Sequence, residues 1–422
     1  MTRILFVLAV LQFGVPCRGQ AVLPTCKPEQ AGMSAARLDE IGKVVEQRIQ
    51  QNRVPGVVVM IARDGKVVFF EAYGNRDQAD QKVMERDTIF RLYSMSKAIT
   101  SAAAMMLVDE GKLSLDEPAS SYVPALAKVK VQTDRGVVAP ARAITVADVM
   151  RHTSGFPDIG DKALFAKVQL NQARDLEDYV ERLVAVPLAA HPGEKWIYGH
   201  SLDVLGLVVQ KVAEQPISEF LDARIFKPLG MVDTAFHVPE SKRDRFATIY
   251  YRPGYPEDEN PVELQDIKAN PLYTAHFYQP PKVQLAGTGL VGTAEDYMRF
   301  MLMIAHGGEW NGRRYLSADV IRLMTTNQLP QQAFPINLYR PGKPEIPRHG
   351  VGFGLGFSVC TTDDSWAKHA HIGEFSWGGA ANTNAWASPR DNNLIVVTME
   401  QVFMPNRETR VALKPVIYGA IE

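Results

Sequence analysis

Strand-forming residues gather at the two ends of the chain, and this distribution constrains the fold more than any other feature. Near the N-terminus, "GVVVMIARDGKVVFFEAYG" holds two β-rich runs separated by residues 63–65, a pattern typical of an antiparallel hairpin. After residue 350, β-rich runs return in "GFGLGFSVC", "GAANTNAWASP" and "NLIVVTMEQV", and a helical run from Arg407 follows. Helical patterns and prolines dominate between about 98 and 285. The sequence therefore predicts one sheet built from both chain ends, with helices inserted between them.

The length and composition fit this arrangement. A chain of 422 residues with 46% hydrophobic content can bury a large core, and we expect two closely joined subdomains. The predicted fold class is α+β, with an antiparallel sheet flanked by helices. Residues 28–110 and 285–422 are assigned to an α/β subdomain, and residues 111–284 to a mainly helical one. Ser34 is a plausible N-cap for an amphipathic helix that ends before Pro55.

The charge balance limits the kinds of partner. With 46 basic and 47 acidic residues the formal net charge is -1, which offers no electrostatic footprint for nucleic acid or for an anionic membrane surface. No segment after the N-terminus is apolar for long enough to span a bilayer. We therefore expect a small-molecule substrate, and the sequence leaves the oligomeric state open.

The N-terminal residues 1–21 have the layout of a secretory signal peptide, which predicts a secreted or periplasmic protein. One arginine precedes an apolar stretch from Ile4 to Gly14, and small and polar residues follow it. Lipid attachment at Cys17 is disfavoured by the proline before it. Removal of the signal leaves Cys26 and Cys360, which the sequence allows either to pair or to stay free.

The stretch "YSMSK" places Ser94 three residues before Lys97, at the start of an apolar helical run. Residues i and i+3 of a helix share one face, so the hydroxyl and the amine can touch, and the lysine can take the proton of a serine nucleophile. Free backbone N–H groups at a helix start also favour developing negative charge. Alone, this pattern is more often an N-cap serine followed by a surface lysine, and the rest of the chain decides between the two.

Motifs along nearly the whole mature chain resemble the serine β-lactamase and penicillin-binding-protein superfamily, and most of all class C β-lactamases and family VIII carboxylesterases. The resemblance rests on "PEQAGMSAARLDEI", "RLYSMSKAIT", "VADVMRHTSGF", "GTGLVGTAEDYMRFMLMI" and "WGGAANTNAWASPRDN". It implies a β-lactamase/transpeptidase-like fold and a serine hydrolase that needs neither a metal nor an organic cofactor.

The resemblance also implies roles for individual residues. Ser94 matches the nucleophile that becomes acylated, Lys97 its general base, and Tyr198 the tyrosine of a Tyr-x-Asn element that shuttles protons. His200 stands where that element has asparagine. It either supplies the substrate-side hydrogen bond of the asparagine or only fills space.

The family's Lys-Thr-Gly element aligns with Trp377, Gly378 and Gly379, as in many family VIII esterases. The backbone N–H groups of Ser94 and Ala380 would then form the oxyanion hole. A rival alignment uses residues 371–373; we prefer "WGGA" because the strand after it leads into the turn "SPRDNN".

Because Trp377 replaces a cation that binds carboxylate, we expect neutral short-chain esters as substrates, with weak β-lactam hydrolysis as a side activity. The alternatives are a β-lactamase or D-amino-acid peptidase, and an acyltransferase that uses the same serine. A further alternative is a protein that only binds ligands. It would keep Ser94, Lys97 and Tyr198 without using them in catalysis.

Several other motifs suggest chemistry less strongly. "GHSLD" nearly matches the nucleophile elbow of α/β-hydrolases, but Asp203 occupies its last position, so we interpret Ser201 as lying near a helix N-cap. "GTGLVG" lacks the βαβ context of a dinucleotide site. His369 and His371 alternate on an expected strand without a third metal ligand. In "HTSGF" we expect a helix to end at Gly155, with Ser154 hydrogen-bonded locally.

Overall fold

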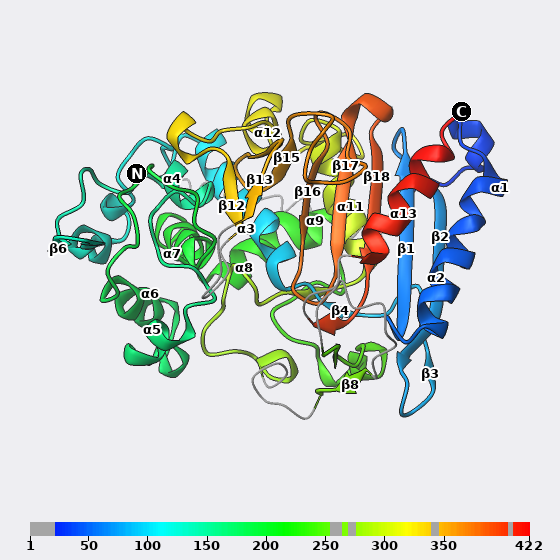
Figure 1. The fold of residues 1–422 in the computed structure, drawn as a ribbon, viewed down its shortest axis with the longest axis horizontal. Helices are drawn as coiled ribbons and strands as arrows, with labels where there is room; N and C mark the ends of the chain where they lie inside the picture. The colour runs from blue at the N-terminus through cyan, green and yellow to red at the C-terminus, as the bar shows by residue number, and fades with distance from the viewer. Residues whose placement is uncertain (1–21, 254–263, 269–275, 339–345, 404–407) are drawn as a thin grey trace, which may run out of the picture.

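The computed structural model describes residues 22–253, 264–268, 276–338, 346–403 and 408–422 (Figure 1). The predicted signal peptide and Cys17 lie outside these ranges, so export stays a prediction. Among the described residues, none of the helices combines the length and the apolar character that crossing a membrane requires.

The centre of the molecule is an eight-stranded sheet with the strand order β14-β15-β16-β17-β18-β1-β2-β3, and every neighbouring pair is antiparallel. The strands are β1 (Gly56–Arg63), β2 (Lys66–Asp77), β3 (Lys82–Val83), β14 (Val351–Phe353), β15 (Ser358–Cys360), β16 (Phe375–Gly378), β17 (Asn384–Ser388) and β18 (Leu394–Met399). The predicted hairpin is confirmed as β1–β2. Because β1 pairs with β18, with Met60 opposite Val397, the sheet is built from both chain ends as expected.

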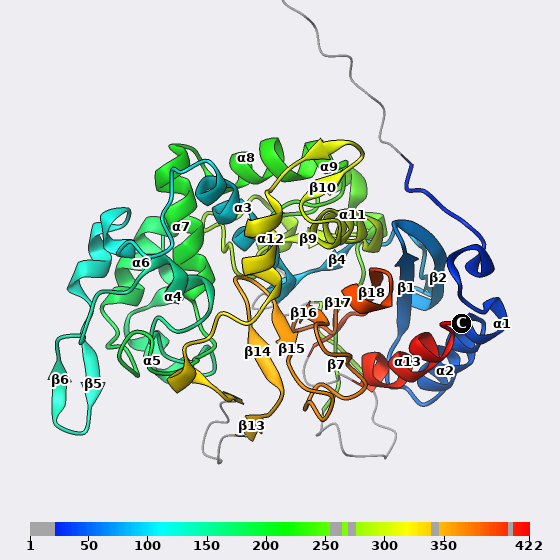
Figure 2. The ribbon, with the colours of Figure 1, turned by 90° about the horizontal axis from the view of Figure 1, so that it is seen from above.

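Helices cover both faces of this sheet (Figures 1 and 2). On one face, α2 (Glu40–Gln50) and α13 (Glu408–Gly419) pack together over the sheet, and α1 (Ala35–Leu38) contacts both. Their core includes Val57, Val59 and Trp386. On the other face, α11 (Ala294–Ala305) contacts β1, β17 and β18. Alternate residues such as Val58 and Met60 point into that second core, as the period of a β-strand requires.

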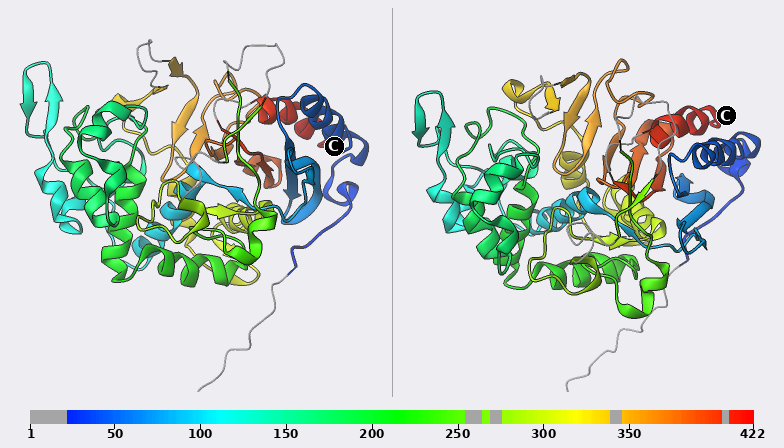
Figure 3. Two further views of the ribbon diagram at one scale, coloured as in Figure 1. Left: turned by 90° about the horizontal axis from the view of Figure 1, so that it is seen from below. Right: turned by 60° about the horizontal axis from the view of Figure 1, so that its bottom comes forward.

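The inserted helices from α4 to α7 lie beside the sheet, at the left in Figure 1, and both views of Figure 3 show the same separation. They are α4 (Val146–Met150), α5 (Lys162–Lys167), α6 (Leu176–Val184) and α7 (Ser201–Ala213). The next two helices, α8 (Ile217–Leu221) and α9 (Lys227–Leu229), continue from them toward the centre of Figure 1. A hairpin of β5 (Val131–Thr133) and β6 (Gly136–Val138) projects from this region. The helix α3 (Ser96–Asp109) contacts α7 and thereby links the two parts. The subdomain boundaries that we assigned from the sequence stay a prediction.

Short strands complete the fold. The pairs are β4 (Phe90–Arg91) with β9 (Val291–Gly292), β10 (Glu309–Trp310) with β11 (Arg313–Arg314), and β12 (Ile336–Leu338) with β13 (Ile346–Arg348). A three-stranded sheet joins β19 (Val402–Phe403), β7 (Tyr250–Tyr251) and β8 (Gln265–Asp266). The helix α12 (Ala318–Thr325) lies between β11 and β12 in the chain. "GTGLVG" ends in β9, an antiparallel strand, and so has no βαβ context.

The β-rich run "GFGLGFSVC" forms two strands, because a turn closed by the Gly354 N–H and the Phe357 carbonyl divides it into β14 and β15. Two local predictions are wrong. His369 and His371 lie in a loop before β16 and not on a strand. The helix α4 ends at Met150, before "HTSGF" begins, since the Thr153 N–H bonds back to the Asp148 carbonyl.

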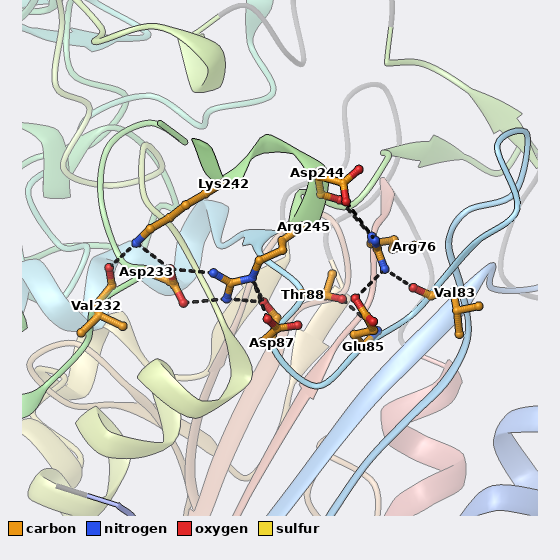
Figure 4. Close-up of polar contacts among 10 residues, drawn as sticks. All are labelled: Arg76, Val83, Glu85, Asp87, Thr88, Val232, Asp233, Lys242, Asp244 and Arg245. Carbon is orange, nitrogen blue, oxygen red and sulfur yellow. Dashed lines mark hydrogen bonds and ion pairs between the residues drawn. The ribbon is translucent and has the colours of Figure 1, made fainter. Parts of the chain in front are cut away.

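A network of ion pairs holds the chain that leads into β4 (Figure 4). Arg245 binds Asp233 through two nitrogens, at 2.7 and 3.1 Å, and also pairs with the carboxylate of Asp87 at 2.8 Å. In a second group of ion pairs beside this one, Arg76 pairs with Glu85 and with Asp244. These contacts join residues 76–88 to residues 233–245, and so fix the approach to the turn that carries Ser94.

Candidate active site

Ser94 lies in a short 3-10 turn, η2 (Tyr93–Met95), between β4 and α3. The Leu92 N–H donates to the Leu290 carbonyl at 2.9 Å, which holds the turn against the segment before β9. Tyr93 has a φ of 44°, a left-handed conformation that non-glycine residues rarely adopt. Its ring lies 5.7 Å from the ring of Phe277 and 5.7 Å from that of Phe403. Packing of the Tyr93 ring between these two aromatic side chains thus fixes the strained turn next to the serine.

The structure brings Lys97 and Tyr198 to the Ser94 hydroxyl. Lys97 Nζ donates to Ser94 Oγ at 3.3 Å, and the Tyr198 hydroxyl donates to the same oxygen at 2.6 Å. Lys97 Nζ also lies 4.9 Å from the centre of the Tyr198 ring. Ser94 is 9% exposed and Lys97 only 2% exposed. A hydroxyl with two proton-handling groups at hydrogen-bond distance has the geometry of an activated nucleophile.

Tyr198 is held by the residues of the "HTSGF" segment. The Ile197 N–H donates to the His152 carbonyl at 2.9 Å, and the Tyr198 carbonyl accepts from the Ile159 N–H at 3.0 Å. A Cβ on Gly199 would lie 2.5 Å from the Pro157 carbonyl oxygen. Only glycine at this position lets the two segments approach so closely, and their approach directs Tyr198 toward Ser94.

His152 is a buried neighbour of Tyr198 that sequence analysis missed as an individual residue. Its ring lies 4.9 Å from the Tyr198 ring and 5.7 Å from that of Trp196. Burial, and secondarily the charge of Lys97, lower the pKa of His152 well below its usual value. Neither ring nitrogen has a hydrogen-bond partner in the described part of the chain. The neutral ring therefore acts as an apolar support for the tyrosine.

Trp377 is another aromatic neighbour of Tyr198. Trp377, on β16, has its ring 5.6 Å from the Tyr198 ring. After β16, a Cβ on Gly379 would lie 2.3 Å from the Leu92 carbonyl oxygen, two residues before Ser94. Ala380 packs against the cluster that contains Tyr93. The two residues whose N–H groups are predicted to form the oxyanion hole, Ser94 and Ala380, thus belong to segments that lie against each other. Gly378, the last residue of β16, directly precedes this contact.

His200 contacts residues of the helical region. Its Nδ1 lies 2.7 Å from the Tyr179 hydroxyl and 3.5 Å from Asp203 Oδ2, and its ring packs edge-on against Phe165 at 4.6 Å. Among the described residues, His200 has no hydrogen bond to Ser94, Lys97 or Tyr198. The second acceptor of Lys97 is instead the Gly287 carbonyl, at 2.8 Å.

The other candidate residues from the sequence motifs make contacts of their own, separate from the Ser94 hydrogen bonds. Ser201 is fully buried, and its hydroxyl lies 2.8 Å from that of Ser154, so the expectation of a local partner for Ser154 is wrong. His371 Nδ1 lies 2.7 Å from Asp391 Oδ2. Cys26 and Cys360 are free thiols. Within the described ranges no group of three or more histidine, cysteine or carboxylate side chains could hold a metal ion.

The comparison with family models decides the affiliation. A model described as Beta-lactamase matches residues 41–414, most of the chain. The chain belongs to the beta-lactamase family. It is 35% identical over 360 residues to Protein Rv1367c of Mycobacterium tuberculosis, covering 82% of this chain and 85% of that protein. It is 29% identical over 397 residues to Esterase EstB of Burkholderia gladioli, covering 89% and 92% of the two chains.

A solved structure has the same fold. EstCE1, described as a hydrolase with promiscuous acyltransferase activity, has a TM-score of 0.73 with this chain at 24% identity, and the match covers 91% of this chain and 99% of EstCE1. The predicted β-lactamase/transpeptidase-like fold and the resemblance to this superfamily are confirmed. A serine hydrolase of the esterase or β-lactamase type is confirmed at the level of the family.

Arg348 is a further residue beside the candidate active site that sequence analysis did not identify. It lies at the end of β13, and its guanidinium carbon is 4.3 Å from the centre of the Trp366 ring. Trp366 and Tyr198 pack on the same apolar cluster. Burial, followed by the charge of Arg410, lowers the pKa of Arg348 to about 10. A lone arginine in the sequence carries no signal that tertiary packing will place it beside an active site.

Proposed function

We propose that this protein hydrolyses short-chain carboxylic esters through an acyl intermediate on Ser94. The observation that carries the proposal is the pair of hydrogen bonds that Lys97 Nζ and the Tyr198 hydroxyl donate to Ser94 Oγ. Similarity to Esterase EstB supports an ester substrate.

The reaction would run in two halves. Ser94 Oγ attacks the ester carbonyl, and its proton passes to Lys97, the general base. The N–H groups of Ser94 and Ala380 would stabilise the oxyanion of the tetrahedral intermediate. Tyr198 then gives a proton to the departing alcohol, and water releases the acid from the serine by the reverse sequence of proton transfers.

The wall beside Tyr198 favours a neutral substrate. Trp377 is an apolar ring at the position where family members that bind β-lactams have a cation, and Phe353 packs against it with ring centres 5.1 Å apart. A β-lactam carboxylate would meet these rings. We therefore propose that esters are turned over faster than β-lactams.

An acyltransferase activity is the second candidate. EstCE1 combines hydrolysis with acyl transfer on the same fold. Both activities use the same acyl-serine and differ only in whether water or an alcohol removes the acyl group. Adding a primary alcohol to the assay and separating ester from acid measures this partition directly.

The test compares hydrolysis of p-nitrophenyl butyrate and of a chromogenic cephalosporin by the wild type, Ser94→Ala, Tyr198→Phe and Ser201→Ala. We expect faster turnover of the ester, no acyl-enzyme with Ser94→Ala, and at least about 100-fold slower turnover with Tyr198→Phe. Ser201→Ala is the matched control, a buried serine with a hydroxyl partner. Faster turnover of the cephalosporin would favour a β-lactamase, and full ester activity in Ser94→Ala would refute the nucleophile.

A further inference from the structure

Lys97 is held in place by a backbone carbonyl as well as by the serine. Its Nζ lies 2.8 Å from the Gly287 carbonyl oxygen and 3.3 Å from Ser94 Oγ. Since the shorter bond goes to Gly287, the position of the amine depends first on where that carbonyl lies. Whatever fixes Gly287 therefore fixes the amine relative to the hydroxyl.

Gly287 is fixed from α7 by Asp203. The Gly287 N–H donates to Asp203 Oδ1 at 2.8 Å, and both groups are buried. A Cβ on Gly287 would lie 3.1 Å from Asp203 Oδ1 and 3.3 Å from Oδ2, so the carboxylate packs directly on the glycine α-carbon. The other oxygen of Asp203 faces His200 Nδ1 at 3.5 Å. Asp203 thus binds the same residue whose carbonyl accepts from Lys97.

The neighbouring residue is fixed from α3. Thr100 lies one helical turn after Lys97, and its hydroxyl donates to the Ala286 carbonyl at 2.7 Å. A Cβ on Gly206 would lie 2.3 Å from the Cβ of Ala286, so α7 also packs closely on this segment. The segment 286–287 is therefore clamped between two helices, with the Gly287 carbonyl directed at Lys97.

From these contacts we propose that Asp203 is a positioning residue, which places the Lys97 amine on Ser94 by holding Gly287. This inference rests on the proposed function of Ser94 and Lys97. Asp203 itself lies beyond hydrogen-bond reach of Ser94, since its contacts are with Gly287 and His200. Asp203, which breaks the match of "GHSLD" to the nucleophile elbow around Ser201, thus acts through Lys97 on Ser94.

The test measures the acylation of Ser94. The p-nitrophenol burst from p-nitrophenyl butyrate, measured over a range of substrate concentrations, gives the acylation rate constant and the dissociation constant of the substrate. We expect Asp203→Ala to lower the acylation rate constant about tenfold or more while the dissociation constant changes less than about twofold, because only the base is displaced. Asp203→Asn keeps an oxygen that accepts from Gly287, and we expect its rate within about threefold of wild type.

A double-mutant cycle separates positioning from general damage to the fold. In a Lys97→Ala background, we expect Asp203→Ala to change the rate by less than about twofold, because its effect acts through the missing amine. Ser201→Ala, two residues earlier on the same helix, is the control and should acylate at the wild-type rate. If Asp203→Ala does not fold, Thr100→Val tests the other side of the clamp, with an acylation rate constant about threefold or more below wild type and an unchanged dissociation constant for the substrate.

Three results would overturn the inference: a wild-type rate in Asp203→Ala, equal losses in Asp203→Ala and Asp203→Asn, or a full effect of Asp203→Ala without Lys97. Failure of the proposed function looks different, because Ser94→Ala would then keep ester turnover. The two hypotheses are thus tested by separate variants of one protein.

Discussion

Asp148 offers the sharpest test of how the structure supports the segment behind Tyr198. Its buried carboxylate accepts hydrogen bonds from Arg142 and Arg151, each at 3.0 Å, and from the Thr153 hydroxyl at 2.9 Å. Burial opposes the charge, but the hydrogen bonds, first those from Arg142, outweigh burial and lower the pKa of Asp148 from 3.8 to about 2. Since each pH unit corresponds to about 1.36 kcal/mol, the charged form contributes about 2.4 kcal/mol to folding.

We expect Asp148→Asn to lower the free energy of unfolding at pH 7 by about 2–4 kcal/mol, because both arginines also lose their acceptor. The folded-state pKa is lowered, so the contribution of Asp148 is complete above pH 4 and is lost as the pH falls toward 2. At pH 3 the gap between wild type and variant should be smaller by about 1 kcal/mol.

Urea unfolding followed by tryptophan fluorescence at both pH values measures this gap. Asp319→Asn is the control, since Asp319 pairs with Arg322 at 3.0 Å on an exposed surface and should contribute about 0.5 kcal/mol or less. A loss below about 1 kcal/mol in Asp148→Asn at pH 7 would refute the reasoning, and so would an equal gap at pH 7 and pH 3.

Three further outcomes are expected. Gly379→Ala should lower kcat/KM for the ester about 100-fold without unfolding the protein, because its Cβ would lie 2.3 Å from the Leu92 carbonyl oxygen. The control is Gly419→Ala, where an added Cβ meets open space. Wild-type turnover in Gly379→Ala would contradict this prediction. Ser201→Ala should cost about 1 kcal/mol of stability, since Ser154 loses its partner, and thermal unfolding measures it. Dialysis against a chelator should leave ester turnover unchanged, and a loss restored by a divalent metal would argue for a metal site.

Much of the fold follows from patterns that are local in sequence. The β1–β2 hairpin needs only two β-rich runs and a short turn, and the pairing of β17 with β18 across "SPRDNN" follows from the same rule. The spacing of Ser94 and Lys97 is local too, because residues three apart meet at the start of a helix. These features could be read before any tertiary contact was known.

Other features depend on contacts between distant segments. Asp203 and Gly287 are joined only through packing of α7 on the segment before β9, and nothing in either local sequence indicates that hydrogen bond. The loop with His369 and His371 resembled a strand because alternation alone cannot show whether a neighbouring strand is present. Similarly, Ser154 finds its partner in Ser201, across the helical region. The family resemblance supplied Tyr198, which spacing alone could not place beside Ser94.

The pairing of Met60 with Val397 also has a consequence during synthesis. A ribosome adds about 5–20 residues per second, so β1 emerges roughly 20–70 s before the strand that pairs with its open side. Throughout that interval β1 presents a row of unpaired backbone groups and a sequence that is apolar except for Arg63, which are the properties of an aggregation-prone edge. A nascent chain stalled before β18 therefore cannot close its sheet, and the last tenth of translation determines whether the first strand is ever protected.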